Sequence, residues 1–347
     1  MMAEITRKTQ MEKIRGFEKG FMAIHLINLG DKLGILETLN KNKAGLTTAE
    51  LAAQLHLHEP YLKFWCQTAY HMEILDSDGD GRFSLQPFLD EILGDKNHVQ
   101  NYLANIAVDV NLIGKGLMDQ GVGCFRTGEL VKAYTDFESS RMTYASTKNI
   151  YLAFLFMILP KHEWLNNLLK EGVRVLDVGC GDGSLVIQLA QAFPQSRFVG
   201  INPDGYGIEM ARAAIAELGL GDRVSVEQVA GEALTYKDEF DLVSLVVTLH
   251  EILPPFRKAA MEKVYQALKP DGTLLILDFP YPSKLEDFRN PMYDYAILDQ
   301  FYEVGIGTIH LNVEEQNDLI RQVGFNNLNR VSIGKGMFDF VTAKKQS

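Results

Sequence analysis

Two kinds of hydrophobic periodicity divide the chain. In the N-terminal part, apolar positions recur at steps of three and four, as in Ile14, Phe17, Phe21 and Ile24, which is the spacing of one helix face. From Val173 onwards, short β-branched or apolar runs alternate with amphipathic stretches. This alternation predicts a parallel sheet with helices on both faces. We therefore expect a mainly helical part followed by an α/β part.

The α/β part contains seven predicted strands. Five of them, RVLDVG, RFVGIN, RVSVEQ, DLVSLVVTL and TLLILDF, are interspersed with three helical stretches. The last two, NLNRVSIG and MFDFVTAK, are separated by the dipeptide Lys335-Gly336. A short connection containing glycine predicts a hairpin, so we expect the last strand to run antiparallel to the others.

The N-terminal part predicts three helices followed by a hairpin, with an apolar helical segment at Leu33, Leu36 and Leu39 before the two helices described next. Thr48 is placed to cap a helix that starts at Ala49, a second helix runs from Pro60 to Met72, and DSDGDGRFSL is typical of a hairpin. This order predicts a winged helix-turn-helix. Its second helix carries one basic residue, Lys63, so a packing or dimerisation role is favoured over DNA binding.

Composition narrows the classes of protein. The chain of 347 residues is 46% hydrophobic and 23% charged, as in ordinary globular proteins. Its net charge of −11 disfavours nucleic acid as a partner. No apolar run suits a membrane span, and the N-terminus does not resemble a signal peptide. Three cysteines without metal-type spacing suit a reducing cytosol, so we expect a cytoplasmic protein.

One glycine-rich segment, VLDVGCGDGSLVIQLA, suggests a ligand site. A buried strand runs into Gly179, Gly181 and Gly183, and a helix begins near Ser184. Glycines let the backbone approach a ligand closely. In an open parallel sheet, ligands bind beyond the carboxyl ends of the strands. The spacing is G-x-G-x-G preceded by Asp177, which differs from the G-x-G-x-x-G of dinucleotide sites.

This segment resembles motif I of the class I methyltransferases that use S-adenosylmethionine. GINPDG with IEMARAAI, GEAL, and LKPDGTLLILDF resemble later motifs of that family, in order. The preceding region resembles the dimerising N-terminal domain of the caffeate and acetylserotonin type O-methyltransferases. The resemblance implies a winged-helix dimerisation domain at 1–95, a helical connector and acceptor-pocket lid at 96–165, and a Rossmann-like catalytic domain at 166–347.

The resemblance also assigns contacts to the cofactor S-adenosylmethionine. The family holds the amino-acid end at the glycine turn, the ribose after the second strand, and the adenine after the third. By position these contacts fall on Asp177, Gly179 and Gly181, on Asn202 with Asp204 in support, and on Gly231 and Glu232. Asn202 departs from the acid usual in the family, because an amide accepts a hydroxyl hydrogen bond without charge assistance.

The candidate chemistry centres on His250 in LVVTLHEIL. In the family, a histidine followed by an acid at this position is the general base, a role that suits a group titrating near neutrality. Two carboxylates orient that base; the first falls on Asp278, and the second falls on His310, a departure. Two histidines and a carboxylate also match a facial metal triad, which some ketoacid C-methyltransferases of the superfamily use. We favour the base and expect no metal.

The predicted function is methyl transfer to a small-molecule hydroxyl by a homodimer built through the first helix. Alternatives are S-methylation of a thioether or thiol acid by positioning alone, metal-assisted C-methylation of a ketoacid, and, outside the class, a winged-helix regulator with a cofactor-sensing domain. No motif names the acceptor. Candidate polar contacts to it are Arg126, Arg141, Tyr144 and Asn149.

Overall fold

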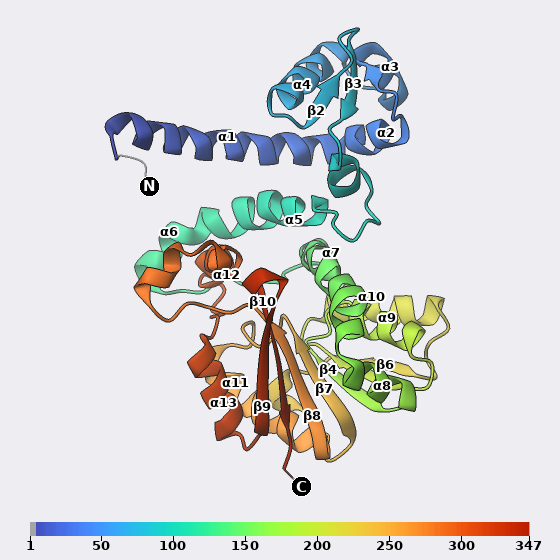
Figure 1. Ribbon diagram of the computed structural model, residues 1–347, viewed down its shortest axis with the longest axis vertical. Helices are drawn as coiled ribbons and strands as arrows, with labels where there is room; N and C mark the ends of the chain where they lie inside the picture. Colours follow the sequence, from blue (N-terminus) through green and yellow to red (C-terminus); the bar gives the residue numbers. More distant parts are fainter. Residues whose placement is uncertain (1–4, 347) are drawn as a thin grey trace. The chain divides into compact units, whose positions relative to one another are not determined.

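The computed structural model describes residues 5–346, which form two compact units that meet between Lys115 and Gly116 in the sequence (Figure 1). Residues 96–115 group with the first unit, and the expected division into three segments stays a prediction. Within the described range, no helix combines the length and the apolar character needed to cross a bilayer.

The N-terminal unit is helical with one small sheet. Its elements are α1 (Arg7–Lys32), α2 (Ile35–Lys41), β1 (Leu46–Thr47), α3 (Thr48–Leu55), α4 (Glu59–His71), β2 (Leu75–Ser77), β3 (Arg82–Leu85), a π-helical turn (Asp90–Gly94), α5 (Leu103–Val108) and a π-helical stretch (Asp109–Leu117). The strands pair antiparallel in the order β1-β3-β2. Ile35, Leu51, Leu62 and Trp65 belong to its core. The expected helices and hairpin are present, and the winged-helix classification stays a prediction.

The cap of α3 differs from our expectation by one residue. Thr47, rather than Thr48, precedes the helix: its hydroxyl accepts from the Glu50 backbone N–H at 3.2 Å, and the Glu50 carboxylate accepts from the Thr47 N–H at 2.9 Å. This reciprocal capping box requires the acid three residues after the cap, which only Thr47 satisfies.

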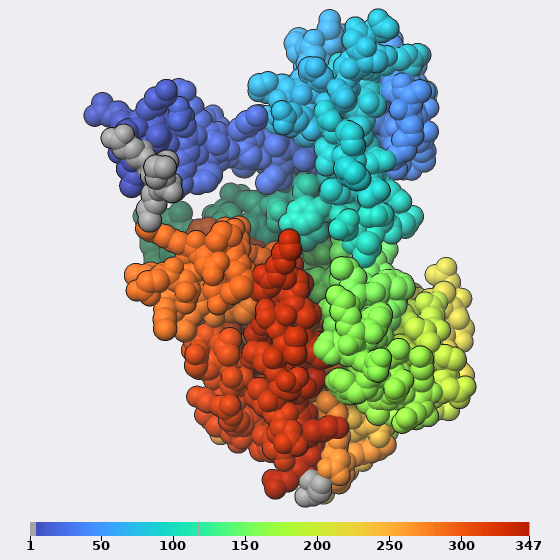
Figure 2. Space-filling model, viewed as in Figure 1, coloured from blue at the N-terminus to red at the C-terminus, as the bar shows by residue number. Residues whose placement is uncertain are grey.

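Helix α1 forms as predicted, and Figure 2 shows its first half projecting from the body of the N-terminal unit. Ile14, Phe17 and Phe21 are 58%, 62% and 61% exposed. Large apolar side chains on a projecting helix are typical of a surface that another chain covers.

The second unit contains the α/β fold. Its elements are α6 (Met118–Thr127), α7 (Phe137–Ala153), a π-helical turn (Phe154–Ile158), a 3-10 turn (Leu159–Lys161), α8 (Glu163–Glu171), β4 (Arg174–Val178), α9 (Ser184–Ala192), β5 (Arg197–Ile201), α10 (Gly205–Glu217), β6 (Val224–Glu227), a 3-10 turn (Gly231–Ala233), β7 (Phe240–Val246), α11 (Pro254–Ala267), β8 (Leu268–Asp278), two 3-10 turns (Leu285–Arg289, Pro291–Tyr293), α12 (Asp294–Glu303), α13 (Val313–Gln322), β9 (Asn326–Ile333), a 3-10 turn (Gly334–Gly336) and β10 (Phe338–Lys344).

The sheet has the predicted seven strands, in the order β6-β5-β4-β7-β8-β10-β9. The first five pair parallel, while β10 pairs antiparallel with both neighbours, which confirms the expected direction of the last strand. Helices α8, α9 and α10 cover one face and α11 and α13 the other (Figure 1). Because both faces are covered, nearly all residues of the central strands β4 and β7 are buried. The strand order reverses between β4 and β7, which is where such sheets bind ligands.

Candidate active site

A cavity of about 790 Å³ lies at the carboxyl ends of β4, β5 and β7. It is lined from β4 and its glycine turn, from the segment after β5, from the turn after β6, from the loop after β7, and from α7 with the residues before it. This volume lies within the range of small-molecule and cofactor sites.

The glycine turn after β4 adopts left-handed backbone angles. Gly179 has φ +78° and lines the cavity; a Cβ there would lie 2.3 Å from Thr248 Cγ2. Gly181 has φ +56°, and a Cβ there would lie 2.8 Å from the Tyr144 ring. Both positions therefore require glycine. Gly181 serves the packing of Tyr144 and is not among the residues that line the cavity.

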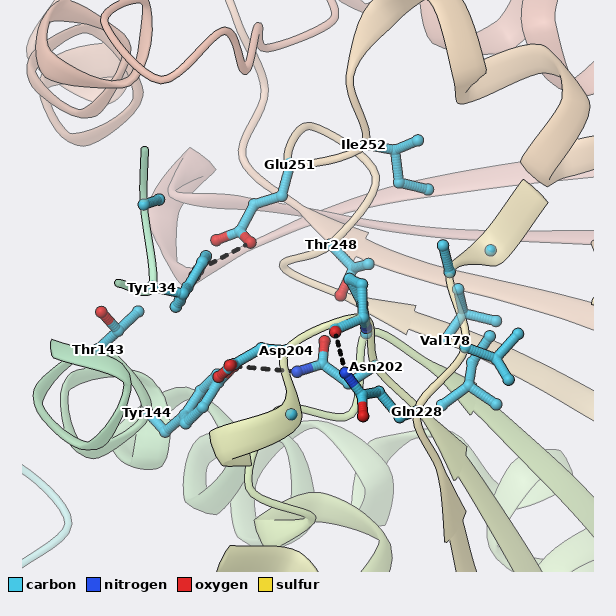
Figure 3. Close-up of a pocket in the computed structure, with 18 of the residues that line it drawn as sticks. Tyr134, Thr143, Tyr144, Val178, Asn202, Asp204, Gln228, Thr248, Glu251 and Ile252 are labelled. Carbon is cyan, nitrogen blue, oxygen red and sulfur yellow. Dashed lines mark hydrogen bonds between the residues drawn. The ribbon is translucent and has the colours of Figure 1, made fainter. Parts of the chain in front are cut away.

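Tyr144 of α7 joins the two predicted ribose contacts (Figure 3). Its hydroxyl donates to Asp204 Oδ2 at 2.7 Å and accepts from Asn202 Nδ2 at 2.9 Å. Asp204 also caps α10, accepting from the backbone N–H groups of Tyr206 and Gly207. The Asn202 amide and Asp204 carboxylate are thus fixed at the cavity wall, where they can accept hydrogen bonds.

Tyr134 and Glu251 form the wall beside the loop after β7, and Figure 3 shows their side chains pointing toward each other. The Tyr134 hydroxyl donates to Glu251 Oε2 at 3.2 Å, and its ring stacks on Tyr144 with centroids 6.0 Å apart. Tyr134 has φ +54°, a costly conformation for an aromatic residue. Burial raises the pKa of Glu251, against the opposing effect of His250. The strained backbone indicates that this side chain is held in place over the cavity.

The remaining cofactor candidates are divided between the wall and the interior. Gly231 and Glu232 line the cavity in the turn after β6. Asp177 is 3% exposed and does not line it; its Oδ1 accepts from Ser244 Oγ at 2.7 Å. Burial raises the pKa of Asp177 to about 7, although the Ser244 hydrogen bond opposes the shift. Asp177 therefore lies beneath the glycine turn.

The three predicted catalytic residues come together in the fold. His250 Nδ1 lies 2.6 Å from Asp278 Oδ1, and the His250 backbone N–H donates to Asp278 Oδ2 at 3.3 Å. The His310 ring stacks on His250 at 4.3 Å with 9° between the planes. All three are buried and none is among the residues that line the cavity. Glu251, the residue after His250, does line the cavity.

Two acids from α12 complete this buried cluster. Glu303 Oε1 lies 3.8 Å from His250 Nε2, and Asp299 Oδ2 lies 2.9 Å from His310 Nε2. Thr308 donates to Glu303 Oε2 at 2.9 Å, and Tyr302 donates to Asp299. Asp299 and Glu303 are four positions apart on one helix face. That spacing was the available signal, but no motif singled out α12.

The carboxylates control the charge of His250. Burial lowers the pKa of its imidazole, but Asp278 and Glu303 together outweigh burial and raise it to about 10. Burial raises the pKa of Glu303 to about 8 despite the nearby His250. Burial also raises the pKa of Asp278, yet the contact with His250 holds it below its ordinary value. The cluster therefore binds protons readily near neutral pH.

The cluster also has the composition of a cation site. Single ligand atoms of His250, Asp299, Glu303 and His310 all lie within 4.8 Å of one another. Asp278, which we expected to be the carboxylate of a metal triad, is not one of these four residues. It contacts Nδ1 of His250 instead. In metal sites, a carboxylate in this position commonly orients the histidine that binds the metal.

Arg257 of α11 fixes the loop that carries His250. Its Nη2 donates to the carbonyls of His250 at 2.9 Å and Ile309 at 2.7 Å, and its Nε to that of Ile252 at 3.1 Å. The sequence offered no signal for this role.

Of the four candidate acceptor contacts, Tyr144 lines the cavity, whereas Arg126, Arg141 and Asn149 do not. Arg141 is exposed and pairs with Glu138 at 2.7 Å.

Comparisons with known proteins agree with this geometry. The methyltransferase domain family matches residues 175–272. The chain is 24% identical over 145 residues to the ubiquinone/menaquinone biosynthesis C-methyltransferase UbiE of Geotalea daltonii, covering 36% of this chain and 61% of that protein. It is 30% identical over 225 residues to the 27-O-demethylrifamycin SV methyltransferase of Amycolatopsis mediterranei, covering 62% and 73%.

Solved structures share the whole fold. Human N-acetylserotonin methyltransferase in complex with SAM gives a TM-score of 0.79 at 14% identity, with 100% of both chains covered. The mitomycin 7-O-methyltransferase gives 0.74 at 20% identity, with 98% of both covered. The sequence relatives, the matched domain and the glycine turn at the switch point lead to one conclusion: the chain belongs to the class I S-adenosylmethionine-dependent methyltransferases.

Proposed function

We propose that this enzyme transfers the methyl group of S-adenosylmethionine to a hydroxyl of a small molecule, with His250 as the general base. The contact that supports this proposal is the 2.6 Å approach of His250 Nδ1 to Asp278, which orients the imidazole and leaves Nε2 for a proton. The names of the rifamycin, acetylserotonin and mitomycin enzymes favour this class of acceptor.

In this proposal Gly179, Asn202, Asp204, Gly231 and Glu232 contact the cofactor from the cavity wall. Asp177 and Gly181 act from beneath, by shaping the turn and holding Tyr144. A base must be neutral, whereas the cofactor-free site favours the imidazolium. A sulfonium bound nearby lowers the pKa of His250, because like charges disfavour one another. Cofactor binding therefore prepares the base, and Glu303 faces the nitrogen that receives the proton.

We also propose the accompanying organisation. Residues 1–95 form a winged-helix dimerisation domain, 96–165 a connector and lid, and 166–347 the catalytic domain, in a cytoplasmic homodimer. The three cysteines are free, which suits a reducing compartment.

The test compares two substitutions. His250→Ala should lower the methyl-transfer rate by ~10²–10⁴, the typical contribution of a general base, with calorimetric affinity for S-adenosylmethionine kept. Asn202→Ala should do the reverse and weaken cofactor binding. Full activity in His250→Ala would reject the base and favour a sulfur acceptor, which needs positioning alone.

The clustering of His250, Asp299, Glu303 and His310 favours a second candidate, metal-assisted C-methylation of a ketoacid. A divalent cation there would supply Lewis acidity toward an enolisable carbonyl. Elemental analysis should then find about one metal per chain, as a single four-ligand site implies. Metal-free protein with full activity in the presence of a chelator would eliminate this candidate.

A further inference from the structure

All the charged side chains that line the cavity are acidic. Four carboxylates lie among its described lining residues, namely Asp204, Glu209, Glu232 and Glu251, whereas these lining residues include no Lys, Arg or His. A cavity of this kind favours ligands that bring positive charge or hydrogen-bond donors, and opposes those that bring a carboxylate.

Three of the acids lie toward the predicted cofactor positions. Asp204 holds Tyr144 and caps α10, Glu209 follows on α10, and Glu232 lies in the turn after β6. Glu251 lies on the other wall and directly follows His250. Its Oε2 accepts from Tyr134, and its Oε1 has no hydrogen-bond partner among residues 5–346. Glu251 thus offers one carboxylate oxygen at the acceptor side of the cavity.

Cationic side chains on the neighbouring segments are already engaged elsewhere. Arg257 uses its Nε and Nη2 on three backbone carbonyls. Arg141 is exposed and paired with Glu138. His250 and His310 face Asp278, Asp299 and Glu303 inside the buried cluster. A carboxylate brought into this cavity would be partly desolvated with no cationic side chain among the described lining residues, which is unfavourable.

We propose that the acceptor is a neutral or cationic hydroxyl compound, without carboxylate or phosphate, and that it donates a hydrogen bond from an ammonium or second hydroxyl to Glu251. This inference rests on the proposed methyl transfer to a hydroxyl and names the acceptor class and the selecting residue. In the transfer, the methyl–sulfur bond breaks and the methyl–oxygen bond forms. The acceptor proton passes to His250, while the donor on Glu251 keeps its hydrogen.

The experiment uses size-matched catechols that differ in charge at one terminus: 4-ethylcatechol, its terminal amine (dopamine) and the corresponding acid (3,4-dihydroxyphenylacetate). Calorimetry on the full chain saturated with S-adenosylhomocysteine measures their binding. We expect the amine and the neutral compound to bind at least about tenfold more tightly than the acid, because only the acid brings a carboxylate into a cavity lined by carboxylates. Equal or tighter binding of the acid, or no binding of the amine and the neutral compound, overturns the proposal.

Two variants identify the selecting residue. Glu251→Gln should reduce the amine-to-acid preference by about tenfold, because it removes the charge and keeps the shape. Glu209→Gln, an exposed acid on the cofactor side, should leave the preference unchanged. Equal losses in both variants would reject Glu251 as the docking group.

Methyl transfer to each catechol separates the two proposals. Selective binding of the amine without any methylated product contradicts the proposed function alone. Methylation of the acid in preference to the amine contradicts this inference alone.

Discussion

At the residue scale, the buried carboxyl of Asp177, next to the glycine turn, makes the stability of the fold depend on pH. Its carboxyl is buried beneath the glycine turn with one hydrogen bond, from Ser244, and burial raises its pKa to about 7. A carboxyl with a raised pKa favours the protonated form in the folded state. Between the unfolded value near 4 and the folded value, the native chain binds more protons than the unfolded chain.

The free energy of unfolding should therefore fall as pH rises from about 4 to 7, through the contribution of Asp177. In Asp177→Asn this contribution disappears, so the variant should gain stability relative to the parent by a few kcal/mol across that interval. Urea unfolding at several pH values measures the difference. Ser244→Ala is the control: it removes the hydrogen bond that favours the ionised form of Asp177, and should extend the fall to higher pH. Parallel pH profiles for the parent and Asp177→Asn would contradict the prediction.

The sequence could predict some site residues because of where strands end. His250 and Asp278 follow neighbouring parallel strands, so their side chains reach the same edge of the sheet. Asp299 and Glu303 could not be predicted this way, since they come from α12, whose approach depends on tertiary packing. Gly181 was predicted to leave room for a ligand, but its space is filled by Tyr144, a residue 37 positions earlier in the sequence. A side chain from so distant a segment leaves no local pattern.

At the element scale, Arg257 connects α11 to the loop after β7 and to the segment before α13. Its guanidinium is buried and donates hydrogen bonds to the carbonyls of His250, Ile252 and Ile309. Burial lowers the pKa of Arg257 from its ordinary high value. These hydrogen bonds hold His250 and the segment of His310 against the same helix.

Arg257→Met keeps the length of the side chain and removes these hydrogen bonds. We expect the free energy of unfolding to fall by about 2 kcal/mol or more, because buried carbonyls lose their donors. Lys258→Met is the matched control: Lys258 is exposed, pairs with Glu262 at 3.9 Å, and should change stability by less than about 0.5 kcal/mol. Denaturant unfolding of both variants measures the contrast. Equal effects would show that the Arg257 bonds contribute nothing specific.

Element type was predictable where the period was clear, and boundaries were less so. The strand runs from β4 to β10 are bounded by Gly, Pro and Asp, and the structure confirms them. The start of α3 was misplaced by one residue, because Thr47 and Thr48 are both good caps by residue type. They differ only in their distance from Glu50, which lies three residues after Thr47, as a capping box requires. Helix α7 ends at Ala153, and the chain continues through a π-helical turn and then a 3-10 turn to Lys161.

At the scale of the whole molecule, the fold class was predictable because a doubly covered sheet requires alternating strands and helices throughout its length. Association between two chains is harder to predict from the sequence, because a periodic pattern shows that a helix has an apolar face but not what covers that face. The face of α1 is the informative case. It has helical period and large apolar side chains, yet within the N-terminal unit only its last turns are buried.

We expect the protein to be a homodimer in which α1 contributes to the interface. Ile14, Phe17 and Phe21 are each more than half exposed, and a two-fold axis would let this helix bury the same face of its partner. Light scattering should give twice the mass of one chain, and the double variant Phe17→Glu/Phe21→Glu should shift it to the monomer mass or become insoluble. Leu285→Glu changes a still more exposed apolar side chain in the other unit, 83% exposed, and should leave the mass unchanged. A parent that stays monomeric at high concentration would show instead that this face is covered within one chain.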